Sequence, residues 1–252
     1  MSTVRYDVTG PVATLTLDAP ARRNAFSADL LAAFRRHLDT AESDPAVRTV
    51  VLSHTGPVFS SGMDLTTTTD VPAEDQPIVA FPALLQRVWE FAKPVIARVD
   101  GKARAGGIGL IAACDLAVAA EHADFAFTEV RLGLVPAVIS VPLLPRLLPR
   151  AALELCLTAE TFGAARAREI GLLNSVVSDV DAEVARYTGL LRLCEPNALA
   201  GTKAMLRRDR AGISMAADFA AMSALSARYF ASPQGQEGIA AFAAKRAPSW
   251  AE

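Results

Sequence analysis

The stretch from Pro94 to Asp115 constrains this chain more than any other, because it joins a β-type segment to an apolar helix through a glycine-rich turn. Residues 94–99 are rich in β-branched side chains and are followed by Asp-Gly, which predicts a buried strand ending in a tight turn. A helix is then expected to begin near Gly107. Its first backbone N–H groups have no partner inside the helix and can hold a developing negative charge. Gly106 and Gly107 lack a Cβ atom and allow a ligand close to the backbone.

One interpretation of this turn is a dinucleotide site. Gly107-x-Gly109-x-x-Ala112 matches the loose glycine fingerprint, and Glu129 follows at about the expected spacing of twenty residues. Such a fingerprint normally lies in the first βαβ unit of a domain, whereas about a hundred patterned residues precede this one. Its first glycine also falls inside the expected helix. The pattern therefore disfavours dinucleotide binding.

Composition excludes several classes of function. The chain has 252 residues, of which 52% are hydrophobic and 21% charged, which is enough for a large globular core. The formal net charge of −2 gives no indication of binding to nucleic acid or to an acidic membrane surface. The N-terminal residues lack the pattern of a signal peptide, and no apolar run reaches the length of a membrane span. We therefore expect a cytoplasmic enzyme.

Cysteines and histidines do not indicate a disulfide framework or a metal site. Three cysteines lie in apolar helical patterns and are expected to be reduced core residues, and three histidines are isolated from one another. The histidine that follows a predicted strand, His54, is interpreted as a loop residue because no nucleophile motif accompanies it. These residues are Cys114, Cys156, Cys194, His37, His54 and His122.

Periodicity along the chain predicts an α/β fold. A β-hairpin is expected over 4–17, and Ser27 is expected to cap a helix that ends before Asp44-Pro45. A buried strand over 49–53 completes a β–α–β alternation, which favours a parallel sheet. The polar segment 66–77 is predicted to be a loop at the rim of a pocket. Further short strands are predicted over 116–120 and 125–128, and helices over 151–157, 164–170, 182–193, 198–207, 215–230 and 235–245.

Four separated stretches together resemble the enoyl-CoA hydratase/isomerase (crotonase) family. They are residues 23–26 (RNAF), 59–65 (FSSGMDL), 93–115 and 127–136 (FTEVRLGLVP). The resemblance implies a spiral of β-β-α units over 1–195, followed over 196–252 by a C-terminal helical region that makes a homotrimer or hexamer. It also implies an acyl-CoA thioester as substrate, with no separate cofactor because coenzyme A is part of that substrate.

The resemblance assigns roles to three residues. The backbone N–H groups of Met63 and Gly106 would form an oxyanion hole for the thioester carbonyl, each donor being worth about 3 kcal/mol. Glu129 falls at the position of one of the two acid/base glutamates of family hydratases. The other glutamate is absent, because its position is occupied by Gly109. Hydration uses two carboxylates, so the sequence does not identify a residue that would activate water.

Further residues are implied in binding the substrate. Apolar side chains after Glu129, with Ile108 before it, are expected to surround the acyl chain and to raise the pKa of the Glu129 carboxyl by desolvation. In the last helix, Phe242 and Lys245 resemble residues that reach the coenzyme A of a neighbouring subunit, although a solvated amphipathic helix explains them equally well. The implied binding residues are Arg23, Asn24, Ala25, Phe26, Ser61, Gly62, Asp64, Leu65, Gly107, Gly109, Val135, Pro136, Ala137, Val138, Ile139, Phe242 and Lys245.

Two classes of function follow. The first is an acyl-CoA enzyme, hydratase-like and acting in fatty-acid or related acyl-CoA metabolism. Isomerisation of a 3-enoyl to a 2-enoyl thioester, which needs only one carboxylate, and decarboxylation, which depends mainly on the oxyanion hole, are its mechanistic competitors. The second class is a CoA-binding protein that has lost catalysis. The residues 63, 106 and 129 favour the enzyme.

Overall fold

The computed structural model describes residues 3–64, 77–208, 221, 225, 228 and 232–251, and the chain divides into two compact units, Met1–Thr188 and Gly189–Glu252. Leu65 and residues 66–76 of the predicted loop 66–77 lie outside the described residues, as does most of the predicted helix 215–230. The prediction of a loop was wrong for Pro77, which begins a helix. The domain boundary predicted between residues 195 and 196 stays a prediction. No helix among the described residues is both long and apolar enough to cross a membrane.

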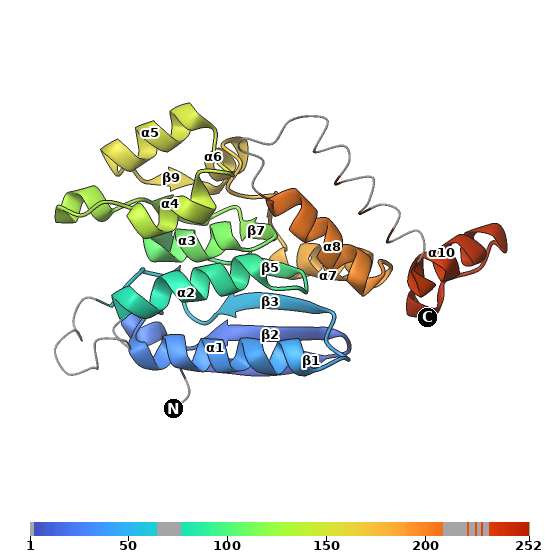
Figure 1. Cartoon of the computed structure of the whole chain (residues 1–252). Coiled ribbons are helices and arrows are strands. Elements are labelled where there is room, and N and C mark those ends of the chain that lie inside the picture. Colours follow the sequence, from blue (N-terminus) through green and yellow to red (C-terminus); the bar gives the residue numbers. More distant parts are fainter. Residues whose placement is uncertain are drawn as a thin grey trace. The chain divides into compact units, whose positions relative to one another are not determined.

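The larger of the two sheets in the first unit has six strands (Figure 1). The first two strands are an antiparallel hairpin, and every other neighbouring pair is parallel, as predicted. The third strand is buried along its whole length, as expected for a central strand covered on both faces. The strands, in spatial order, are β1 (Val4–Thr9), β2 (Val12–Leu17), β3 (Thr49–His54), β5 (Val95–Val99), β7 (Leu116–Ala120) and β10 (Ser175–Val177).

A second sheet of four short strands gives the unit its repeating pattern. Each of its first three strands follows directly on a strand of the large sheet, and a helix comes after each such pair. This is a succession of β-β-α units. Because three of the short strands are parallel, their carboxyl ends reach the same edge and place their following loops together. The strands are β4 (Val58–Ser60), β6 (Lys102–Arg104), β8 (Asp124–Ala126) and β9 (Phe162–Gly163).

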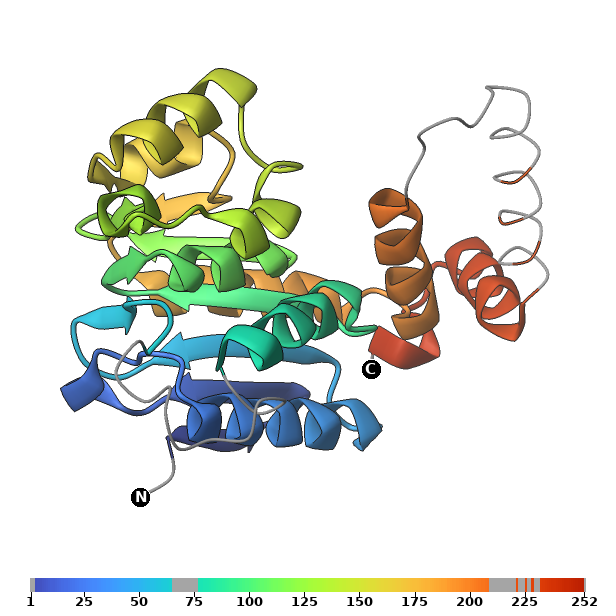
Figure 2. The same cartoon turned by 60° about the vertical axis from the view of Figure 1, so that its left-hand side comes forward.

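Four helices form a layer in which each contacts the next (Figures 1 and 2). They are α1 (Ala28–Ser43), α2 (Pro77–Glu90), α3 (Gly106–Ala113) and α4 (Ala137–Leu143). The Ser27 hydroxyl accepts a hydrogen bond from the Leu30 amide, which confirms the predicted N-cap of α1. Every residue of α3 is buried. Sequence patterns did not predict α2 or α4, both of which contain an internal proline.

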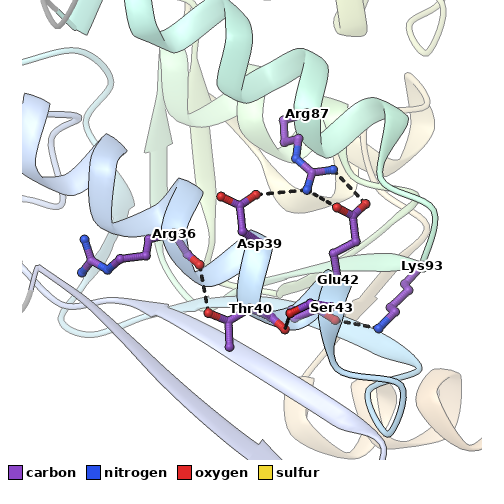
Figure 3. Close-up of polar contacts among 8 residues, drawn as sticks. Arg36, Asp39, Thr40, Glu42, Ser43, Arg87 and Lys93 are labelled. Carbon is purple, nitrogen blue, oxygen red and sulfur yellow. Dashed lines mark hydrogen bonds and ion pairs between the residues drawn. The ribbon is translucent and has the colours of Figure 1, made fainter.

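Ionic contacts join α1 to α2 (Figure 3). The Arg87 guanidinium donates to both carboxylate oxygens of Glu42 and, over 3.1 Å, to Asp39. The hydrogen bond and charge of Arg87 lower the pKa of the Glu42 carboxyl. Lys93 donates to the carbonyl oxygens of Ala41 and Asp44 over 2.6 Å each, which closes the carboxyl end of α1. These contacts fix the start of the segment that leads into β5.

The remaining helices largely match the predicted segments. They are α5 (Pro149–Thr158), α6 (Ala164–Glu169), α7 (Val180–Arg192), α8 (Pro196–Arg207) and α10 (Pro233–Ala243). Within the second unit, the Trp250 indole donates to the Leu193 carbonyl over 3.1 Å, and Glu237 pairs with Arg246. The predicted helix 235–245 ends two residues early, and Lys245 has a φ of 53°. Of the three cysteines predicted to lie in the core, Cys114 is buried and Cys156 is half-buried against the core, whereas the prediction was wrong for Cys194, which is exposed.

Two glycine substitutions in helices should have opposite effects on stability. An added Cβ at Gly107 would lie 2.7 Å from the Ser60 carbonyl oxygen, whereas one at Gly189 of α7 would meet no heavy atom within 4 Å. We expect Gly107→Ala to lower the free energy of unfolding by about 1–3 kcal/mol through overpacking. The matched control Gly189→Ala should raise it by about 0.5–1 kcal/mol, because alanine loses less entropy in a helix. Urea denaturation measures both, and two shifts of the same sign would contradict the packing argument.

Candidate active site

Two loops at the edge of the small sheet meet at the start of α3. The Phe26 amide donates to the Gly62 carbonyl over 2.8 Å, and the Asp64 amide donates to the Phe26 carbonyl over 3.2 Å. This is a parallel bridge between Phe26 and Met63. In such a bridge the amide of the central residue points away from the partner strand, because successive amides of an extended chain alternate in direction. The Met63 N–H is therefore turned away from Phe26.

The two loops approach through backbone atoms that carry no side chain. Gly62 has a φ of 91°, and a Cβ atom there would lie 3.2 Å from the Gly106 nitrogen and 3.1 Å from the Ala105 Cβ. A Cβ at Gly106 would lie 3.2 Å from the Phe81 ring and 3.4 Å from the Gly62 Cα. A side chain at Gly62 would press on the start of α3, and one at Gly106 would press on the Phe81 ring. The pair of glycines thus sets the distance between the 61–64 loop and α3.

Ala105 adopts an unusual backbone conformation directly before the helix, with φ 45° and ψ −117°. A non-glycine residue in this region stores strain, which persists only when the surrounding structure holds it. Its amide donates to the Ala126 carbonyl over 3.2 Å, and its carbonyl accepts the amides of Ile108 and Gly109. These bonds fix the direction of the first turn of α3.

The amides of Met63 and Gly106 are available as donors. Within the described part of the chain, neither N–H donates a hydrogen bond to a protein acceptor. Gly106 is the first residue of α3, where the backbone amides have no intrahelical partner and the helix dipole is positive. Both residues border one cavity. The arrangement can therefore hold an oxygen atom that gains negative charge.

Glu129 also lines this cavity and belongs to the short turn that follows β8. It begins η3 (Glu129–Leu132), and its side chain is half-buried. Its Oε2 atom is buried and accepts no hydrogen bond from the residues that the structure describes. Burial raises the pKa of the Glu129 carboxyl, while a hydrogen bond to its own backbone lowers it to a smaller extent. A carboxyl whose pKa is raised by burial is suited to accept and return a proton.

The cavity has a volume of about 390 Å³ and walls that are mainly apolar. Of the predicted residues, it brings together Met63, Gly106 and Glu129 with Ser61, Asp64, Val135, Pro136, Ala137, Val138 and Ile139. Sequence reasoning missed Phe81 and Pro77 of α2, and also Ala105, Thr128, Leu132 and Leu134. The apolar spacing of Phe81, Leu84, Leu85 and Val88 was a signal for α2 that could have been used.

A second hollow of about 480 Å³ shares a wall with the cavity. Both are lined by Ser61, Met63, Asp64 and Thr128. The second hollow is further lined by Ala21, Arg22, Arg23, Ala25 and Arg104. Arg22 pairs with the buried Asp64 carboxylate, and Arg104 pairs with Asp124. With three guanidinium groups and one carboxylate on its wall, this hollow favours a negatively charged ligand.

The predicted ligand stretch 23–26 divides into lining and buried residues. Arg23 and Ala25 border the second hollow, whereas the side chains of Asn24 and Phe26 are fully buried. Asn24 donates to the carbonyls of Thr55 and Val58 and accepts the Ala19 amide. Phe26 stacks on Phe81 at 4.8 Å between ring centroids. The structure thus gives these two side chains contacts within the protein.

Gly107 and Gly109 are not among the residues that line the cavity, because Gly107 packs on strand β4 and Gly109 packs on helix α4. Gly107 faces Ser60, and Gly109 faces Ile139 of α4. An added Cβ at Gly109 would lie 2.5 Å from Ile139 Cγ2 and 2.8 Å from its Cβ. The space beside this position is therefore filled by an apolar side chain. Leu65 and the side chain of Phe242 lie outside what is described, and Lys245 is an exposed residue of the second unit.

Histidines and acidic groups form no metal centre in the part of the chain that the structure describes. His37 stacks on Tyr6. His54 is buried and accepts the Asp100 amide through Nε2 over 2.9 Å, so the expectation of a loop histidine was wrong. It ends β3 and packs edge-on against Phe59.

Comparison with known proteins shows that this chain is similar in sequence and in fold to members of one family. A family model described as enoyl-CoA hydratase/isomerase matches residues 7–252. The chain is 32% identical to enoyl-CoA hydratase EchA19 of Mycobacterium tuberculosis, over 96% of this chain and 93% of the relative. It is 29% identical to the peroxisomal Delta(3,5)-Delta(2,4)-dienoyl-CoA isomerase of Arabidopsis thaliana, over 99% of this chain and 96% of that relative. The crystal structure of an enoyl-CoA hydratase from Shewanella pealeana matches with a TM-score of 0.92 at 31% identity, over 98% and 96%, which confirms the predicted fold class.

The raised pKa of Glu129 predicts a pH-dependent difference between wild type and Glu129→Gln. Between the unfolded value of about 4.3 and the raised folded value, the native state binds more protons than the unfolded state, so wild-type stability falls as pH rises. Glutamine does not titrate. We expect the free energy of unfolding of the variant, relative to wild type, to increase from pH 4 through the folded pKa and then to level off. Urea denaturation at several pH values measures this, and a difference that stays constant or decreases would contradict the burial of the carboxyl.

Proposed function

This chain belongs to the enoyl-CoA hydratase/isomerase family, and from that premise we propose that it is an enzyme acting on an acyl-CoA thioester. The thioester carbonyl would lie in the cavity, where its oxygen accepts hydrogen bonds from the Met63 and Gly106 amides. The second hollow would receive the phosphate-bearing part of coenzyme A beside Arg22 and Arg23. Coenzyme A enters as part of the substrate, so no separate cofactor is needed.

Proton transfer by one carboxylate is the chemistry that the site supports best. The Glu129 carboxylate would remove a proton from the α-carbon of a 3-enoyl thioester, and the electron pair would move onto the carbonyl oxygen. The two amides would stabilise the resulting dienolate. Glu129 would then return the same proton to the γ-carbon, giving the conjugated 2-enoyl thioester. Atoms and electrons balance within the substrate, so this isomerisation requires no other reactant.

The observation that carries this proposal is the contact between Gly109 and Ile139. Hydration needs a second carboxylate to activate water, and the resemblance assigns it to position 109. Here that position has no side chain, and Ile139 fills the space beside it. Asp64 also lines the cavity, but its carboxylate is paired with Arg22. Glu129 is thus the carboxyl left for proton transfer among the described lining residues.

Hydration of a 2-enoyl thioester is a second candidate, because the relative from Mycobacterium tuberculosis is named a hydratase. It would share the oxyanion hole and Glu129 but would need another group to activate water. Assay of purified protein with 2-enoyl-, 3-enoyl- and malonyl-type CoA thioesters separates isomerisation, hydration and decarboxylation. Binding of these thioesters without turnover would instead support a CoA-binding protein that has lost catalysis.

Substitution of the proposed acid/base residue should separate turnover from binding. Glu129→Gln is nearly isosteric, so affinity for an acyl-CoA should stay within about threefold while kcat falls by about 10²–10⁴-fold, as for a lost general base. Glu121→Gln is the matched control, since Glu121 is exposed in the turn before β8. The control should keep full activity. Equal losses in the two variants, or no loss with Glu129→Gln, would remove Glu129 from the mechanism.

Restoring a second carboxylate should require a change in α4 as well. Gly109→Glu alone should destabilise the protein by about 1–3 kcal/mol, because its Cβ meets Ile139. Ile139→Gly removes both close atoms and leaves the residue 139 Cα at 3.4 Å, an ordinary contact. We expect the double variant to be more stable than Gly109→Glu and to have a higher ratio of hydration to isomerisation than Ile139→Gly alone. Both rates are measured on the same enoyl-CoA pair. An unchanged ratio would show that the second carboxylate does not limit hydration.

A further inference from the structure

A third hollow, of about 510 Å³, lies between α2 and α4 beyond the reaction cavity. Its α2 wall is one stripe of the helix, since its residues recur at spacings of three and four. Its α4 wall has the same spacing. The residues are Pro82, Leu85, Gln86, Trp89 and Glu90 on α2, and Val138, Val141 and Pro142 on α4.

The third hollow adjoins the reaction cavity along both helices. Val138 lines both spaces. On α2 the cavity touches Pro77 and Phe81, and the third hollow begins at Pro82. Because a helix rises 1.5 Å per residue, the cavity adjoins the first turns of α2 and α4 and the third hollow adjoins the turns that follow. A chain leaving the cavity past Val138 would enter the third hollow.

The walls of the third hollow suit an alkyl chain. Val141 is 74% exposed, so a large apolar surface there has no cover among the described residues. The two polar side chains of the wall are bonded to each other, with Gln86 Nε2 donating to Glu90 Oε1 over 3.0 Å. The Arg146 guanidinium lies 5.2 Å from the centroid of the Trp89 ring, as a cation–π contact on one face of the indole. Such a wall offers little to a phosphate or a sugar and favours methylene groups.

We propose that the third hollow receives the distal part of the acyl chain, which makes this a site for medium- or longer-chain acyl-CoA thioesters, with Val141 as a determinant of chain length. This inference rests on the proposed function, since it requires the thioester to bind at Met63 and Gly106. Val138 stands at the junction, where the chain passes from the reaction cavity to the third hollow. A short chain would end inside the reaction cavity and would not reach Val141.

Calorimetric titration with butyryl-, octanoyl- and decanoyl-CoA tests the inference without turnover. Full burial of a methylene group corresponds to about a fourfold gain in affinity. The dissociation constant should therefore fall by at least tenfold from butyryl- to decanoyl-CoA. The absence of binding by all three thioesters would overturn the proposed function itself. Binding of butyryl-CoA with no gain for the longer chains would overturn the chain-length inference alone.

A charged residue on the exposed wall provides the matched comparison. Val141→Glu places a carboxylate in the third hollow, whereas Leu144→Glu makes the same change three residues further on, at a 57% exposed position that does not line it. Val141→Glu should weaken decanoyl-CoA binding at least tenfold and change butyryl-CoA binding less than twofold. Leu144→Glu should change neither. Equal effects of the two variants, or equal effects on the two ligands, would overturn the inference.

Light scattering on the same variants tests another occupant of the third hollow. If Val141→Glu lowers the oligomer mass while both affinities stay unchanged, the hollow is a contact between copies of this chain and the inference is wrong. An unchanged mass with the expected loss of decanoyl-CoA affinity supports an acyl-chain site.

Discussion

The close approach of Gly62 to the Gly106 amide is the contact on which the site depends. Parallel pairing of β4 with β6 brings the ends of these strands to one edge, but the last few ångströms are set by the missing side chains. Ser60 secures the first loop, because its hydroxyl donates to the Asn24 carbonyl and accepts the Gly62 amide. The buried Asn24 side chain in turn binds three backbone groups. A change at any of these positions would alter the spacing between the Met63 and Gly106 amides, the two donors of the proposed oxyanion hole.

The two acidic residues among the described residues that line the cavity have different surroundings and therefore suit different roles. Asp64 is buried and paired with Arg22, so its charge is compensated within the protein. Glu129 lies between apolar walls with its Oε2 buried and unbonded among the described residues, and its pKa is raised. A compensated carboxylate holds a loop in place, whereas a desolvated one gains basicity and can exchange a proton with a substrate. The surroundings of each carboxyl, rather than its residue type, therefore suit Asp64 to holding a loop and Glu129 to the proposed proton transfer.

In the proposals above, helix α4 affects both the type of reaction and the length of the acyl chain that the site accepts. Ile139 packs on Gly109 and fills the place where a second carboxylate would have to lie. One residue earlier, Val138 borders both the reaction cavity and the hollow between α2 and α4. Neighbouring residues on a helix point in different directions, so a single short helix can close one space and border another. In the proposed function and the chain-length inference, reaction type and chain-length selection are therefore linked through α4, and a change in its position would affect both.

Local sequence determined the first five strands of the large sheet, the first helix and the glycine-rich turn, because hydrophobic spacing, the Ser27 cap and the residues at turns act over a few positions. It also singled out Met63, Gly106 and Glu129 through motifs of fixed order. It did not predict β6, β9 or β10, which are only two or three residues long and carry no periodic pattern. Only the tertiary structure decided which side chains share a space with them. Phe81, Ile139 and Arg22 come from segments far apart in sequence, and the burial of Asn24 and Phe26 depends on strands paired later in the chain. Spacing along one segment carries no information on what another segment packs against it. The contact of Gly109 with Ile139 and the full set of residues that line the cavity were therefore decided by packing.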